Sequence, residues 1–224
     1  MSGWADDFGS YDSGHFWTNL AADGGVTGFA ESDGEHGIIQ GATGATDNNE
    51  VMARSTNELL LFQADGTFIF ESRIQFAEAA TDDANVAVGL ADAAAANLLS
   101  DDGAGDNINS SGVLIFKIDG GTVWRCAVEN NGVVSEDVSI QTAGGASYQT
   151  LTILGRQNMG TVEYEITYFL DHKPLRLSTG KAIRHSMSYA SATEMRAVAG
   201  YIKAGGANSE TLNIDYCAFG QRRV

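Results

Sequence analysis

The sequence predicts an all-β protein, folded as a two-sheet antiparallel sandwich of about a dozen strands. Residues 161–170 alternate apolar side chains with Glu and Thr, which is the period of a strand with one buried face. Residues 67–76 repeat that alternation, with Phe and Ile on one side. Turns rich in Gly, Asn and Asp separate such segments at roughly 8–12-residue spacing, as in a sandwich or barrel.

The predicted strands follow one another with short polar turns between them. They cover residues 26–30, 36–41, 51–55, 58–62, 67–76, 85–91, 112–118, 122–129, 133–140, 148–156, 161–170, 175–178, 193–202 and 210–219. Residues 171–173 form a turn before Pro174, which has no N–H to donate and therefore suits the start of an edge strand. Small side chains on one face of residues 85–91 predict that another segment packs closely there. The Ala-rich residues 92–99 are expected to form one helical turn.

Length and composition favour a single domain over residues 1–224, since all-β sandwiches commonly reach this size undivided. No stretch approaches the roughly 18 apolar residues that span a membrane. The opening MSGWADDFGS lacks the basic and apolar regions of a secretory signal. We therefore expect no membrane partner and no secretion by signal peptide.

The net charge of −16 is unevenly distributed along the chain. Residues 1–110 carry 19 Asp and Glu against two Arg, a net −17, whereas residues 111–224 carry 10 acidic and 11 basic residues, a net +1. A surface this acidic repels phosphate backbones, so we expect no nucleic-acid partner. The asymmetry reflects either general solubility or an acidic half that faces solvent while the more neutral half docks on a partner.

Motifs for metal, cofactor or nucleophilic chemistry are missing from the sequence. His15, His36, His172 and His185 are scattered, and no HExxH pair sets two ligands on one face. GxSxG, Walker and dinucleotide-binding glycine patterns are not found either. We therefore expect no catalytic residues, no cofactor and no enzymatic activity.

Two acidic groups are alternatives to that expectation. Glu163 and Glu165 form the only E-x-E pair on a predicted strand and could act as glycosidase carboxylates, but they lie opposite the apolar stripe, where solvated charges are expected. Asp101, Asp102 and Asp106 lie in a DDGAGDN loop whose oxygens could gather around calcium. That loop lacks the EF-hand register and its distal Glu, so an ordinary turn is the simpler interpretation.

Both cysteines, Cys126 and Cys217, fall in predicted strands. Buried thiols in a reducing compartment are the favoured interpretation, and a disulfide is the alternative. Trp124 shares a strand face with Cys126, so we predict that its ring packs in the core rather than stacking on a sugar.

Four stretches together resemble the concanavalin A-like (LamG-type) jelly rolls. The first is the opening DDF (Asp6, Asp7, Phe8) with the later Phe16-Trp17, and the second is the closing LNIDYCAF of residues 212–219. The third, VEYEITYFLDHKPL, is similar to the "fyvDgk" hairpin of that family. The fourth, GVLIFKIDGGTVWRCAVENNG, looks like a hairpin of phage virion proteins that carry this domain. The lectin-type Mn/Ca ligand cluster and the ExDxxE catalytic strand of laminarinase-like members have no counterpart in this sequence. The resemblance therefore implies that the fold serves as a scaffold.

This resemblance implies a non-enzymatic structural protein of a phage virion, foremost a head decoration (cement) protein. It would bind the major capsid protein and neighbouring copies of itself on the virion, after assembly in the host cytoplasm, and stabilise the capsid lattice as a homo-oligomer. The basic end, Arg222, Arg223 and Val224, would contact the capsid. The alternative is a carbohydrate-binding module or lectin-like domain that binds host-surface glycans, and a glycoside hydrolase is the third possibility.

Overall fold

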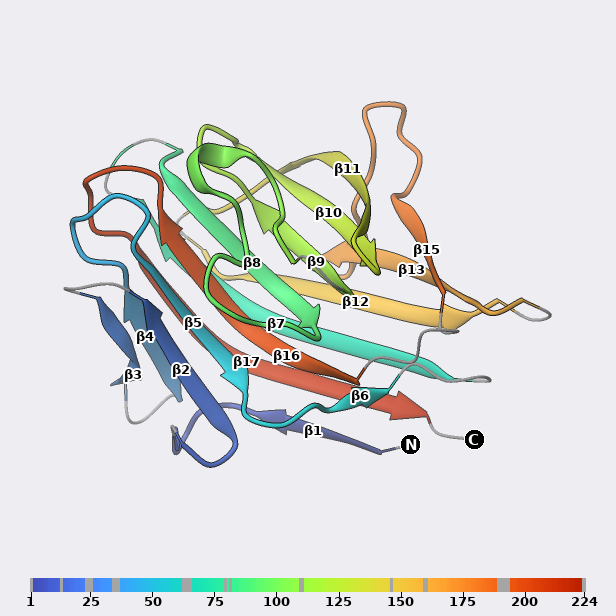
Figure 1. The fold of residues 1–224 in the computed structure, drawn as a ribbon, viewed down its shortest axis with the longest axis horizontal. Helices are drawn as coiled ribbons and strands as arrows, with labels where there is room; N and C mark the ends of the chain where they lie inside the picture. The colour runs from blue at the N-terminus through green and yellow to red at the C-terminus, as the bar shows by residue number, and fades with distance from the viewer. Residues whose placement is uncertain are drawn as a thin grey trace.

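Two antiparallel sheets stack face to face in the structure (Figure 1). The computed structural model describes residues 2–12, 14–22, 26–33, 37–61, 66–78, 80, 82–108, 111–145, 147–158, 161–188 and 194–222. Within these residues there are seventeen strands and one short 3-10 helix, Asp101–Gly103. None of the helical segments described is long and apolar enough to cross a membrane. The predicted two-sheet sandwich is confirmed, with more strands than the dozen expected.

Sheet A contains nine of the strands. They are β1 (Ser2–Asp6), β3 (Thr27–Asp33), β4 (Ile38–Ala42), β7 (Thr67–Ala77), β12 (Gln149–Gln157), β13 (Glu163–Leu170), β14 (Lys173–Pro174), β15 (Arg184–Ser188) and β17 (Thr211–Arg222). Their order is β14-β13-β12-β7-β17-β4-β3, with β1 also paired to β17 and β15 to β13. The N-terminal and C-terminal strands therefore lie side by side (Figure 1).

Sheet B contains the other eight strands. They are β2 (Trp17–Ala22), β5 (Glu50–Ser55), β6 (Leu60–Leu61), β8 (Ala84–Ala91), β9 (Ser111–Lys117), β10 (Val123–Asn130), β11 (Val133–Thr142) and β16 (Glu194–Ala204). Their order is β11-β10-β9-β8-β16-β5-β2, with β6 paired to β16. In this sheet β11 is the terminal strand on one side.

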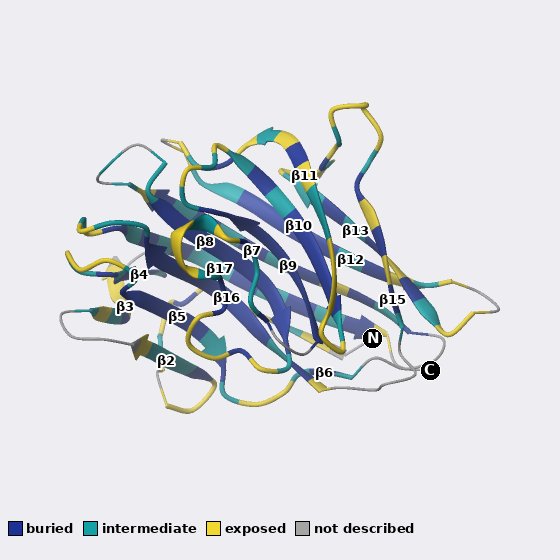
Figure 2. Ribbon diagram, turned by 45° about the horizontal axis from the view of Figure 1, so that its top comes forward, coloured by how far each residue is buried: buried dark blue, intermediate teal, exposed yellow. Residues whose placement is uncertain are grey.

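The main core lies between the sheets and is built by alternation along strands such as β7 (Figure 2). On β7, Phe68 and Phe70 are buried in the core, whereas Ile69 between them is 42% exposed on the outer face. Ser72 interrupts the apolar side, but its hydroxyl donates to the carbonyl of Ala199 at 2.6 Å. Burial of each large apolar side chain contributes about 1.5–3 kcal/mol, so this alternation determines which face of the strand points inward.

Sheet B is also covered on its outer face over β8 and β9. Every residue of β8 and β9 is buried, because the chain between these strands, residues 92–108, folds back over them. We call this segment the covering loop. A second apolar cluster forms beneath it and includes Ala87, Leu98 and Phe116. The close packing predicted for the small face of residues 85–91 is thus confirmed.

Two local predictions are wrong. The Ala-rich residues 92–99 form no helix, because the carboxylate of Asp92 accepts the N–H groups of Ala93 at 2.6 Å and Ser111 at 3.1 Å and turns the chain away from helical geometry. The return strand predicted for residues 175–178 is instead β14, which covers only residues 173–174. It begins earlier because the preceding turn has only two residues.

That turn consists of Asp171 and His172, which both adopt left-handed dihedrals, with φ of 48° and 63°. Leu170 therefore pairs directly with Lys173, and Pro174 lies on an edge strand as predicted. Strands β1, β2 and β15 were not predicted, because their short sequences have no clear alternation.

Candidate ligand-binding face

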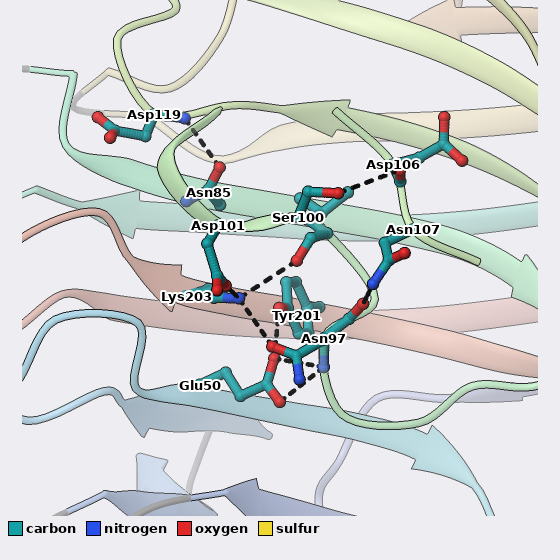
Figure 3. A network of polar contacts seen from close by, with 11 residues as sticks. Glu50, Asn85, Asn97, Ser100, Asp101, Asp106, Asn107, Asp119, Tyr201 and Lys203 are labelled. Carbon is teal, nitrogen blue, oxygen red and sulfur yellow. Dashed lines mark hydrogen bonds and ion pairs between the residues drawn. The ribbon is translucent and has the colours of Figure 1, made fainter. Parts of the chain in front are cut away.

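A buried lysine fastens the covering loop to sheet B (Figure 3). The fully buried Lys203 of β16 donates from Nζ to Asn97 Oδ1 at 2.9 Å and to the carbonyl of Leu99 at 3.3 Å. It also forms an ion pair with Asp101. Burying a charge is costly unless it is paired and hydrogen-bonded, and the covering loop supplies all three partners.

A buried glutamate completes this network. Glu50 of β5, the cross-strand neighbour of Lys203, accepts the backbone N–H of Asn97 at 2.7 Å and the hydroxyl of Tyr201. Burial and the adjacent carboxylate hold the pKa of Tyr201 well above its usual value. The outer face of sheet B over β8 and β9 is therefore occupied by protein that is anchored through two buried charges.

The three aspartates considered for calcium do not share a centre. Asp101 is paired with Lys203, and Asp102 is exposed in a left-handed conformation with φ of 52°. Asp106 lies toward β10 and β11, where burial, and then the Glu136 carboxylate, raises its pKa. In the part of the chain that the structure describes, no three His, Cys, Asp or Glu side chains gather closely enough to hold a metal ion.

A β-bulge in β17 brings two polar side chains to the outer face of sheet A. The pairing with β7 shifts by one residue between Ile214 and Tyr216, so that Tyr216 lies opposite Arg73. Ile214 and Cys217 both point into the core, and the extra residue, Asp215, therefore projects outward together with Tyr216. Bulges commonly redirect side chains in this way beside binding sites.

Arg73 is the centre of the first half of this outer-face cluster. Its guanidinium forms an ion pair with Asp215 and lies over the ring of Tyr148, with Cζ 4.8 Å from the ring centroid. The Arg73 side chain is 41% exposed, so a ligand can reach its remaining donors.

Glu71 is the centre of the second half. Its two oxygens accept the hydroxyl of Tyr216 at 2.6 Å and the hydroxyl of Thr152 at 2.8 Å. Burial, followed by the Glu71 carboxylate, raises the pKa of Tyr216 to about 12, so this hydroxyl stays protonated at neutral pH. We refer to the two halves together as the β7–β17 cluster, which consists of Glu71, Arg73, Tyr148, Thr152, Asp215 and Tyr216.

Two hollows flank the β7–β17 cluster along the same pair of strands. One has a volume of about 490 Å³ and is lined by Gly3, Trp4, Ala5, Ile69, Glu71, Ala218, Phe219 and Gly220. The other has a volume of about 440 Å³ and is lined by Gln75, Phe76, Ala77, Glu78, Gly145 and Asn213. From Ile69 to Gln75 the strand advances about 20 Å, so hollows and cluster form one elongated, solvent-facing track.

The other acidic pair considered from the sequence lies at the side of the same face. Glu165 of β13 is exposed and forms an ion pair with Arg184 at 2.7 Å, and Glu163 is half-buried. The pair faces solvent, as predicted, and lies two strands away from β7. Arg222 ends β17 as an exposed residue, while residues 223–224 of the predicted docking end lie outside the described residues.

The histidines do not converge. His15 is exposed beside Asp12, at 2.7 Å, and His172 lies in the β13–β14 turn. His185 is buried, and its ring lies between Tyr168 Oη at 2.8 Å and Asp137 Oδ2 at 3.3 Å. His36 lies outside the described residues.

Both cysteines are free and buried, Cys126 on sheet B and Cys217 on sheet A, and burial raises the pKa of each thiol. Trp124 is buried in the core as predicted.

Comparison with known proteins establishes the fold. No family model and no curated protein matches the sequence. Among solved structures, peanut lectin is similar with 12% identity and a TM-score of 0.59 over 100% of both chains. An endo-1,3-beta-glucanase from Streptomyces sioyaensis has 11% identity and a TM-score of 0.62, covering 99% of this chain and 96% of the enzyme. The Emp47p carbohydrate recognition domain has 10% identity and a TM-score of 0.59, covering 97% of this chain and 93% of its own.

The chain therefore has the concanavalin A-like fold, which these lectins and the glucanase share. The resemblance noted in the sequence is confirmed at the level of the fold, and none of these three proteins is a phage protein by its description.

The β7–β17 cluster was not predicted from the sequence, although one signal was present. The core-facing residues Leu212, Ile214, Cys217 and Phe219 are spaced by two, three and two positions. A spacing of three inside a period-two strand indicates a bulge, and the two residues within it, Asp215 and Tyr216, are those that reach the outer face.

Proposed function

We propose that this chain is a non-catalytic carbohydrate-binding domain and that its ligand, an extended glycan, lies along β7 and β17 on the outer face of sheet A. The observation that carries the proposal is the β7–β17 cluster. There Arg73, Asp215, Glu71 and the tyrosines combine charged hydrogen-bonding groups with aromatic surface between two hollows.

The chemistry of the cluster suits sugar hydroxyl groups. Arg73 offers donors, and the oxygens of Asp215 and Glu71 are acceptors fixed in place by their protein partners. Tyr216 and Tyr148 present half-buried rings whose apolar faces can pack on a sugar ring. The fold neighbours described as lectins and as a carbohydrate recognition domain support the same ligand class.

Two features support binding rather than catalysis. The covering loop occupies the outer face of sheet B over β8 and β9, and apolar side chains pack beneath it. On sheet A, both oxygens of Glu71 already accept hydrogen bonds from hydroxyl groups, and Asp215 is paired with Arg73. These carboxylates are therefore engaged as acceptors, and a general acid requires a carboxyl group that can donate its proton.

The test is a glycan array followed by titration of the glycans that bind. Arg73→Ala and Tyr216→Ala should each weaken binding roughly tenfold or more, which corresponds to about 1.4 kcal/mol. Arg184→Ala is the matched control, because it breaks another arginine–carboxylate ion pair, 2.7 Å to Glu165, elsewhere on the same face. Absence of glycan binding would refute the function. Asn107 lines a separate hollow in the covering loop, so loss of binding in Asn107→Ala would refute only the location on sheet A. Hydrolysis of a bound glycan that Glu71→Gln abolishes would overturn the non-catalytic part.

A structural role as a phage head decoration protein is the second proposal, with the major capsid protein and neighbouring copies as partners. The feature that favours it is the group of exposed apolar side chains on β11, since decoration of a lattice needs a contact surface of this kind. Particles of a virus that encodes the chain should contain it and release it at high salt. Particles that lack it would exclude this role.

A further inference from the structure

Within the described residues, strand β11 presents an edge that carries both unpaired backbone groups and apolar side chains. It pairs with β10 on one side. Among the described strands none pairs along its other side, where the N–H of Ile140 donates to the carbonyl of Arg176 at 2.9 Å. Residues 133–139 thus form an open edge of sheet B, which we call the β11 edge.

The hairpin geometry shows which backbone groups point outward. Asn130 and Val133 are cross-strand partners around Asn131 and Gly132, whose φ values of 50° and 78° indicate a two-residue primed turn. The pair that flanks such a turn is hydrogen-bonded, and the pattern alternates along the strand. The N–H and C=O groups of residues 134, 136 and 138 therefore point away from β10. The outward N–H of Ile140, which reaches Arg176, follows the same parity.

The side chains of the β11 edge are unusually apolar for an exposed strand. Four of the seven large apolar side chains that are exposed in the described chain belong to β11, namely Val133, Val134, Val138 and Ile140. Their exposed fractions lie between 45% and 72%. Exposed edges are commonly protected by Lys or Pro, and residues 133–142 contain neither.

Charge distinguishes between the possible occupants. Glu136, midway between Val134 and Val138, pairs with Arg125 at 2.7 Å, and the Asp106 carboxylate lies close enough to interact with it electrostatically. In an antiparallel pair of two β11 edges that matches Val134 with Val138, Glu136 would face its own copy, and like charges directly opposite are destabilising. The chain as a whole carries −16, which adds to the repulsion between copies.

We propose that the β11 edge binds an extended segment of a partner protein, added to sheet B as an antiparallel strand. The segment carries apolar side chains at two positions four residues apart, opposite Val134 and Val138, and a Lys or Arg midway between them, opposite Glu136. Main-chain hydrogen bonds to residues 134, 136 and 138 supply affinity, and the alternating side chains supply specificity. This inference is independent of the glycan proposal, because β11 belongs to the other sheet.

The test uses two capped peptides of about seven residues, Thr-Val-Thr-Lys-Thr-Val-Thr and the same sequence with Glu in place of Lys. The Lys peptide should bind at least about tenfold more tightly than the Glu peptide, with a preference that weakens at high salt. It should slow hydrogen exchange at the amides of residues 134, 136 and 138. Equal affinities, or no binding at about 1 mM Lys peptide, would overturn the proposal.

Three variants make the test specific. Val138→Pro removes an N–H that points away from β10, which an edge strand tolerates, and should weaken binding about tenfold or more. Glu136→Lys should reverse the preference toward the Glu peptide. Val162→Lys, at another exposed valine, should change neither. If sedimentation shows a dimer of the wild type that Val138→Pro dissociates, the occupant is a second copy and the proposal is wrong.

Discussion

Replacement of Lys203 by methionine is expected to release the covering loop and destabilise the protein by about 3 kcal/mol. Methionine keeps most of the aliphatic length of lysine and removes the ammonium group. Breaking a buried pair by deleting one partner costs about 3–5 kcal/mol. The lower end applies here, because Asp101 is 58% exposed and regains water, whereas Asn97 Oδ1 and the Leu99 carbonyl lose a charged donor.

Urea unfolding measures the global effect, and a loss of this size should lower the midpoint by about 1 M. Hydrogen exchange measures the local effect, because the Asn97 amide is bonded to Glu50 only while the covering loop is docked. Lys173→Met, at an exposed lysine, is the control and should change stability by less than about 0.5 kcal/mol. A loss below about 1 kcal/mol in Lys203→Met, with Asn97 exchange unchanged, would show that the buried charges do not hold the loop.

Three further predictions concern titratable groups. Burial lowers the pKa of His185 in the folded state, so the free energy of unfolding should fall as pH drops below about 6.5, where the unfolded chain takes up the proton. The urea midpoint of the wild type should therefore fall over this pH range, and that of His185→Gln should not. The pKa of Asp106 is raised on folding, so Asp106→Asn should raise the urea midpoint at pH 7. Near about pH 3 the carboxyl group is protonated in both the folded and the unfolded protein, so the midpoint should be nearly unchanged there. Equal gains at both pH values would contradict this. The raised pKa values and burial of Cys126 and Cys217 predict no reaction with a thiol reagent until the protein unfolds, and rapid labelling of the native state would contradict the buried positions.

The sandwich could be predicted from the sequence because alternation is a local property. In β7 and β13 successive side chains face the core and solvent in turn, so apolar residues recur at every second position of the sequence. The close packing over β8 was also predictable, since small side chains on one face indicate a neighbouring segment. The β11 strand itself was predicted, but its exposed apolar residues fitted the strand pattern and gave no sign that the strand forms an edge.

The anchoring network and the β7–β17 cluster depend on residues far apart in the sequence. Lys203 binds Asn97, 106 positions away, and Tyr216 binds Glu71, 145 positions away. No local sequence pattern predicts such contacts, because they arise from the order of strands within each sheet. The DDGAGDN loop shows the same limit. Its aspartates are neighbours in sequence, yet Asp101 and Asp106 point to different partners once the loop is folded over sheet B.

The extra residue in β17 places two consecutive side chains of the chain's final strand on the outer face. With Asp215 present, Cys217 and Phe219 face the interior and Ala218 and Gly220 face outward. Deletion of Asp215 would make the strand regular and leave both sets in place, because the core-facing residues would then be spaced by two positions throughout. A single-codon deletion at this position would therefore preserve the interior of the C-terminal strand and remove only the acidic partner of Arg73, so the extra residue serves the outer face of the sheet and not its core.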